Sequence, residues 1–104
     1  QLGINPVQLL PGGESWFHVG ARNQSLDMLK FAAVHQLNVN QVNHEGMSPL
    51  LEACLTATDI DLLKWLVDIG ADAGLMSPFG ETAFDLASEN EALMTADLEF
   101  LKAK

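Results

Sequence analysis

The sequence repeats itself with a period of 33 and then 34 residues, and this feature restricts the possible folds more than any other. A glycine followed two positions later by a hydroxyl residue begins each copy, at Gly13, Gly46 and Gly80. The small residues seven positions after these glycines are Gly20, Ala53 and Ala87. A period of this length is typical of chains built by stacking one supersecondary unit on the next.

Two further marks keep nearly the same period. The first combines a leucine, a charged residue and an aromatic residue, in Leu29-Lys30-Phe31, Leu63-Lys64-Trp65 and Leu98-Glu99-Phe100. The second is Gly3-Ile4-Asn5, Gln36-Leu37-Asn38 and Gly70-Ala71-Asp72. Because the aromatic residues recur in register, we interpret them as packing between repeats rather than as a ligand pocket.

The local signals predict two helices in each unit. Ser15, Ser48 and Thr82 precede apolar segments, as helix N-caps do. In the middle unit, Pro49 falls at the first position of a short helix that we expect to end near Leu55.

A polar break follows this helix and leads to a second one. Its apolar residues are Ile60, Leu63, Leu66 and Val67, which share one face of a helix. Gly70 is expected to end it in the left-handed conformation. The segment 71–79 has no helical period and predicts an extended loop or short hairpin.

This arrangement resembles the ankyrin repeat. The matching segments are Gly46-Met47-Ser48-Pro49-Leu50, Ala53-Cys54, Leu66-Val67 and Gly70-Ala71-Asp72. The resemblance implies an all-α solenoid of stacked helix-turn-helix units with extended finger loops. It divides the chain into the end of a truncated repeat (1–12), two repeats (13–45 and 46–79) and a C-terminal capping repeat (80–104).

Both ends of the chain depart from a regular repeat. The third unit is polar after Ala87, and its second helix is expected at about Thr95 to Lys102, which favours a capping role because a terminal repeat shows water a polar face. The first residues lie inside a repeat, so we expect the array to continue upstream. The histidine of the family pattern survives at His18, and the resemblance implies that it bonds backbone across neighbouring fingers.

The composition indicates a globular chain with an acidic surface. Hydrophobic residues make up 48% of the sequence and charged residues 18%, and Lys64 and Asp68 interrupt the longest apolar runs, so no membrane span is expected. The net charge is −9 with five basic residues, which argues against nucleic acid as a partner. Ten acidic residues lie in 59–104, so a protein partner is expected to be basic; a solvated surface that only aids solubility is the competing interpretation.

No pattern of catalytic chemistry is found. Cys54 is the single cysteine and lies in an apolar stretch, which favours a buried core residue. His18, His35 and His44 fall at three different places in the repeat, so neither a metal site nor a nucleophile pair is expected. We therefore expect no enzyme activity, no metal and no cofactor.

The resemblance implies that a protein partner binds the finger loops and the concave face of the first helices. The candidate binding residues are His44, Glu45, Met47, Leu55, Pro78, Phe79, Glu81, Arg22 and Asn23. Met76 and Phe79 have a competing interpretation as local core beneath neighbouring fingers. The favoured function is a monomeric protein-binding module, and the alternative is a structural segment that caps an array whose recognition surface lies upstream.

Overall fold

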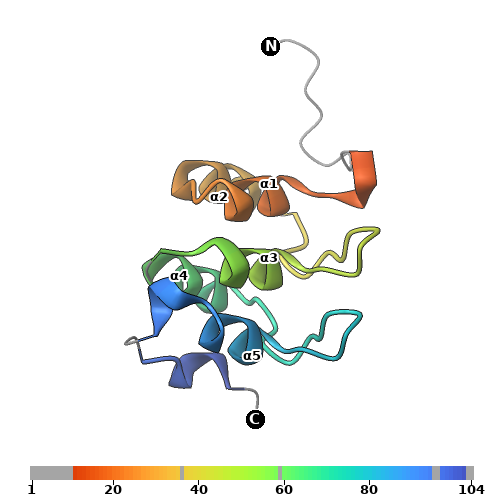
Figure 1. Cartoon of the computed structure of the whole chain (residues 1–104). Helices are drawn as coiled ribbons and strands as arrows, with labels where there is room; N and C mark the ends of the chain where they lie inside the picture. The colour runs from red at the N-terminus through yellow and green to blue at the C-terminus, as the bar shows by residue number, and fades with distance from the viewer. Residues whose placement is uncertain (1–10, 36, 59, 95–96, 103–104) are drawn as a thin grey trace.

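The computed structural model describes residues 11–35, 37–58, 60–94 and 97–102, and this part of the chain consists of helices joined by loops (Figure 1). The α-helices are α1 (Trp16–Arg22), α2 (Leu26–Val34), α3 (Pro49–Thr56), α4 (Asp61–Asp68) and α5 (Ala83–Ser88). The short 3-10 helix η1 (Pro11–Gly13) precedes α1, and the 3-10 helices η2 (Glu91–Leu93) and η3 (Glu99–Leu101) follow α5. These residues form no β-strand, only an isolated bridge between Met76 and Thr82. The predicted all-α solenoid is thus confirmed.

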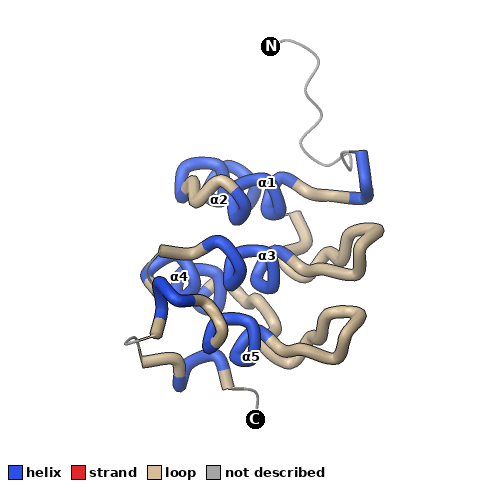
Figure 2. Tube along the Cα trace, viewed as in Figure 1, coloured by secondary structure: helices blue, strands red, loops and turns tan. Residues whose placement is uncertain are grey.

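The helices form a stack of layers (Figure 1). Within a layer, α1 packs on α2 and α3 packs on α4; between layers, α1 packs on α3 and α3 packs on α5. Extended loops leave the stack on one side, which Figure 2 shows as tan segments ahead of α3 and α5. We call residues 37–48 the second finger and residues 71–82 the third finger.

The predicted N-caps begin the first helix of every layer. The hydroxyl of Ser15 accepts a hydrogen bond from the Phe17 N–H (3.2 Å), and that of Ser48 accepts one from the Leu51 N–H (3.3 Å). Thr82 caps α5 by accepting from the Asp85 N–H at 3.3 Å. Each such cap is worth about 0.5–2 kcal/mol relative to alanine, so the three hydroxyls fix where the first helices start.

Gly70 ends α4 as predicted, with a positive φ of 114°. The Ala71 N–H donates to the Leu66 carbonyl and the Gly70 N–H to the Val67 carbonyl, both at 3.0 Å. This pair of bonds is the Schellman motif, which satisfies carbonyls that the helix end would otherwise leave unpaired. The chain can therefore turn sharply from α4 into the third finger.

The predicted second helix of the third unit differs from the structure. In place of a helix from about Thr95 to Lys102, the described residues form only η3; Thr95 itself lies outside them. The Asp97 side chain accepts a hydrogen bond from the Glu99 N–H at 3.1 Å, a local bond that competes with a regular helix. The expected apolar side is nevertheless kept, because Leu98 and Leu101 are buried.

One continuous core runs through the layers. Its largest fully buried apolar side chains are Phe17, Leu29, Leu50, Leu51, Leu63, Leu66, Leu93 and Leu101. The small buried residues Ala21, Ala53 and Ala87 belong to the first helices and let neighbouring layers approach closely. The core thus holds the first helices in a row and the fingers on one side of it.

Candidate functional site

Each finger is closed by a hairpin-like pair of backbone groups. The Asn43 N–H donates to the Met47 carbonyl (3.0 Å), and the Ser77 N–H donates to the Glu81 carbonyl (2.8 Å). The side chains of Asn43 and Ser77 accept further bonds from backbone N–H groups inside the same turns. The fingertips are therefore defined surfaces and not open loops.

Neighbouring fingers stack by placing a ring against a glycine. Gly13 and Gly46 have φ values of 74° and 80°, in the left-handed region that favours glycine. A Cβ atom on Gly13 would clash with the ring of His44, and one on Gly46 would clash with the ring of Pro78. His44 and Pro78 are thus held on the preceding finger while remaining exposed to solvent.

His18 joins the first layer to the second finger. Its Nδ1 atom accepts a hydrogen bond from the Ser15 N–H (3.0 Å), so the Nε2–H donates to the Met47 carbonyl (2.8 Å). This arrangement confirms the role implied by the resemblance. Burial lowers the pKa of His18 below its ordinary value, although the bond to Met47 and the charge of Glu14 act in the opposite direction.

Arg22 makes a second link between the layers, on their surface. Its guanidinium pairs with Glu14, and its Nη2 atom lies 3.3 Å from Glu52 Oε1 on α3. The side chain is 42% exposed, so the pairs stabilise the fold by no more than about 1 kcal/mol. The two ion pairs matter more for binding than for stability, because two carboxylates already neutralise the positive charge of Arg22.

The candidate binding residues fall into two groups by exposure. His44, Glu45, Leu55, Pro78, Phe79, Arg22 and Asn23 are exposed, whereas Met47 and Glu81 are half-buried. Met47 packs against the core, and the Glu81 backbone closes the third finger. The residues are not gathered into a single patch, since Leu55 lies near the C-terminal end of α3 while the third finger enters the N-terminal end of α5.

The third finger carries the most exposed apolar residue of the candidate set, Phe79, together with a second exposed apolar residue, Met76. Phe79 is 88% exposed, and Met76 in the same finger is 59% exposed. The competing interpretation of these two side chains as local core is therefore wrong. The sequence could not decide whether these side chains are exposed or buried, because a short apolar run in a turn has the same pattern whether its tip faces solvent or a neighbouring finger.

A comparison with protein families identifies the repeats. Residues 17–67 match the family described as ankyrin repeats (many copies). This part of the chain belongs to the ankyrin-repeat family. Ankyrin repeats are generally protein–protein interaction modules, so a protein is the expected class of partner.

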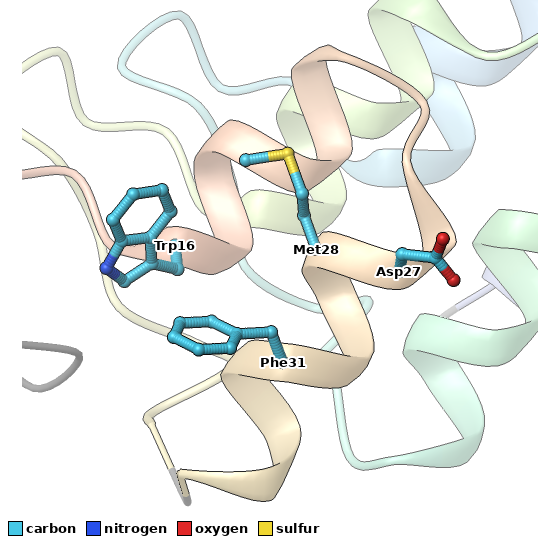
Figure 3. A pocket seen from close by; sticks show the side chains of 4 residues that line it. All are labelled: Trp16, Asp27, Met28 and Phe31. Atoms are coloured by element: carbon cyan, nitrogen blue, oxygen red, sulfur yellow. The ribbon is translucent and has the colours of Figure 1, made fainter. Parts of the chain in front are cut away.

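The ankyrin stack also presents an apolar groove that sequence reasoning did not single out. Trp16, Asp27, Met28 and Phe31 line it, between α1 and α2 (Figure 3). The rings of Trp16 and Phe31 meet edge to face, with centroids 5.9 Å apart. The signal that could have found it is the repeat itself, because Met28 and Phe31 correspond to Leu62 and Trp65 one unit later.

The ankyrin layers bury the single cysteine of the chain. Cys54 is fully buried in α3, and burial raises the pKa of its thiol to about 12. Within the described ranges, no group of three or more His, Cys, Asp or Glu residues is placed to hold a metal ion. No helix among the described residues is long and apolar enough to cross a membrane.

Proposed function

We propose that this ankyrin-repeat chain is a non-enzymatic protein-binding module whose partner contacts the fingers and the concave face of the first helices. The observation that carries the proposal is the exposure of Phe79, 88% on a closed finger. Aromatic residues and methionine are enriched in protein interfaces relative to the rest of the protein surface. Met76 and Pro78 extend the same tip, and we define these three residues as the fingertip cluster.

The geometry of the third finger supports recognition rather than flexible exposure. The Ser77 hydroxyl accepts from the Phe79 N–H at 3.2 Å and from the Glu81 N–H at 3.3 Å. Pro78 is seated on Gly46 of the preceding finger. A backbone fixed in this way loses little conformational entropy on binding, which favours affinity.

The charge around the fingertip cluster favours a basic partner. Between Lys64 and Lys102 the sequence contains eight acidic residues and no basic one. Of the acids closest in sequence to the cluster, Asp72 and Asp85 are exposed and Glu81 is half-buried. A partner that offers an apolar pocket flanked by Lys or Arg would match both features, and its association should slow as salt is added.

The absence of enzymatic activity is proposed from how the reactive groups are engaged. Both ring nitrogens of His18 are in hydrogen bonds, so neither is available as a base in the folded layer. A thiol with a pKa of about 12 supplies almost no thiolate near pH 7. Binding, and not catalysis, is the role that the exposed groups support.

The test is a capture experiment with the whole chain as bait. Wild-type protein and the double variant Met76→Ser/Phe79→Ser are compared for proteins retained from cell extract at low and high salt, with identification by mass spectrometry. Met94→Ser is the matched control, because Met94 is 72% exposed but lies outside the fingers. Proteins retained by wild type and by Met94→Ser, lost with the double variant and weakened by salt support the proposal.

Two results would count against it. The same proteins retained by all three baits would show that the fingertip cluster is not the binding surface. A fall in the melting temperature of the double variant would show that Met76 and Phe79 contribute to stability instead. That second result would favour the alternative role, a structural segment of a longer ankyrin array.

A further inference from the structure

The four methionines of the chain differ in how far solvent reaches them. Met94 is 72% exposed and Met76 is 59% exposed, whereas Met28 and Met47 are half-buried. Met28 lines the groove between α1 and α2, and Met47 packs against the core. Oxidants convert the thioether of methionine into a sulfoxide, and they must reach the sulfur to do so. Met76 and Met94 are therefore the methionines most open to oxidation.

The two exposed methionines lie in different parts of the stack. Met76 belongs to the fingertip cluster with Pro78 and Phe79, on the loop that Figure 2 shows ahead of α5. Met94 directly follows η2, which lies on the side of the stack away from the fingers (Figure 1). A sulfoxide at Met76 would alter the fingertip, whereas one at Met94 would leave it unchanged. Met94 is thus an internal control for oxidation elsewhere on the surface.

The second finger keeps an apolar side chain at the place that Met76 takes in the third. Val42 precedes Gly46 by four positions, as Met76 precedes Gly80. Val42 is 43% exposed, so both fingers present an apolar side chain there. The side chain of the third finger alone carries a sulfur atom. Valine is therefore the matched replacement at position 76, because it removes the oxidisable atom and stays apolar.

The backbone around Met76 is held by bonds that do not involve its side chain. Met76 forms an antiparallel bridge with Thr82, and the Ser77 N–H donates to the Glu81 carbonyl at 2.8 Å. The Ser77 hydroxyl accepts two further N–H groups inside the turn. An oxygen added to the exposed sulfur of Met76 would be solvated, so these bonds should persist. The sulfoxide should therefore make the fingertip polar without unfolding the chain.

The thiol of Cys54 does not compete for a mild oxidant. Cys54 is fully buried in α3, and burial raises the pKa of its thiol to about 12. The thiolate is the form that reacts, and little of it exists near pH 7. A change that mild oxidation causes in the folded chain should consequently come from methionine.

We propose that Met76 is an oxidation site at which a hydroperoxide weakens binding by the fingertip cluster. The sulfur lone pair attacks one peroxide oxygen and forms the S–O bond as the O–O bond breaks. The proton of the transferred oxygen passes to the departing hydroxide. Sulfur loses two electrons and becomes a sulfoxide, and hydrogen peroxide is reduced to water.

The sulfoxide weakens binding because a polar group must lose its water to enter an apolar pocket. That loss costs free energy unless the pocket supplies a hydrogen bond. The inference rests on the proposed function, since oxidation affects binding only where the fingertip cluster is the binding surface. Methionine sulfoxide can be reduced enzymatically, so the loss of binding should be reversible.

The test compares the wild-type chain with Met76→Val and Met94→Val. Each is treated with hydrogen peroxide at increasing dose, and the peroxide is removed before further measurement. Peptide mass spectrometry gives the oxidation rate of every methionine, and thermal unfolding gives the Tm. Capture from cell extract then compares treated with untreated baits.

Met76 and Met94 should oxidise severalfold faster than Met28 and Met47. Oxidised wild type and oxidised Met94→Val should retain severalfold less of the proteins that the untreated baits retain, at an unchanged Tm. Met76→Val should retain the same proteins before and after peroxide. Methionine sulfoxide reductases should restore capture by oxidised wild type.

Three outcomes would overturn the inference. One is oxidation of Met76 no faster than that of Met47, and another is an equal loss of capture by oxidised Met76→Val. The third is full capture by oxidised wild type where the Met76→Ser/Phe79→Ser bait has lost it. Retention by that double variant would contradict the proposed function and the effect of oxidation on binding, whereas slow oxidation of Met76 would contradict this inference alone.

Discussion

The imidazole of His18 lies with its Nε2 atom 2.8 Å from the carbonyl oxygen of Met47, 29 residues further along the chain. The bond joins the first turn of α1 to the second finger, and the Ser15 N–H holds the other ring nitrogen in the matching tautomer. A single side chain therefore couples the start of one ankyrin layer to the loop that begins the next. The bond from Ser15 requires the neutral imidazole, because a protonated Nδ1 atom could no longer accept it, whereas the bond to Met47 favours the protonated ring.

Stability should consequently fall as the solution is acidified through the range in which His18 titrates. Burial lowers the pKa of His18 in the folded chain below the ordinary value of 6.5, so the unfolded chain binds the proton more readily. The stabilisation is complete above about pH 6.5 and is lost as the pH falls toward the lower folded value. Urea unfolding at several pH values between 7.5 and 5 measures how the free energy of unfolding changes with pH.

The His18→Gln variant is the reference for this experiment. It keeps His35 and His44, so the difference between the two pH profiles isolates His18. Its profile should be flatter over the same range, even though its stability at pH 7.5 is lower. Parallel profiles would mean that His18 does not carry the pH dependence.

Replacing Gly46 by alanine should destabilise the chain more than replacing Gly80. Both glycines have a φ of 80°, so alanine meets the same backbone strain at each, about 1–3 kcal/mol. A Cβ on Gly46 would in addition clash with Pro78, whereas one on Gly80 meets nothing within 4 Å. Denaturant titration measures the free energy of unfolding of the two variants, and the difference between them is the free-energy cost of separating neighbouring fingers. An equal loss of stability in both variants would show that Pro78 moves aside freely.

Asn90→Ala should weaken the contact between the second and third layers. The amide of Asn90 donates to the carbonyls of Cys54 (3.0 Å) and Ala57 (2.9 Å), at the C-terminal end of α3. Leaving these carbonyls unpaired should cost about 1–3 kcal/mol. Asn23→Ala provides the comparison, since Asn23 is exposed and should change stability by less than about 0.5 kcal/mol. A similarly small change in stability for both variants would show that Asn90 does not bridge the two layers.

Cys54 should be unreactive toward a thiol reagent in the folded chain. Its side chain is fully buried, and burial raises the pKa of the thiol to about 12, so little thiolate forms at pH 8. Reaction with a disulfide reagent should be slow in buffer and rapid in 6 M guanidinium chloride. A rapid reaction in buffer would indicate that α3 opens easily at Cys54.

The features that depend on neighbouring residues in the sequence could be predicted. The three N-caps are an example, because a hydroxyl bonds to an N–H only two or three residues away. The turn at Gly70 is another, since it is built from the last residues of α4 and the two that follow. Both signals act over less than two helical turns, so the sequence alone carries them.

The features that depend on another layer could not be predicted in the same way. Met47 was expected on the binding surface, but it lies half-buried against the core because α1 approaches it through His18. In the third finger, Pro78 lies against Gly46 of the preceding finger, whereas Phe79 beside it is exposed. The second helix of the third unit was expected over eight residues, yet the Asp97 side chain favours a local turn there.

The linear packing order, α1 on α3 and α3 on α5, has a consequence for how the chain opens. Since α3 is held from both sides, its amide hydrogens should exchange with solvent more slowly than those of α1 and α5, which have a partner layer on one side within the described stack. Opening events should start at the outer layers and spread inward, one layer at a time. A partner that binds the third finger would therefore slow amide hydrogen exchange most in α5. The number of layers in which exchange also slows would show how many layers unfold as one cooperative unit.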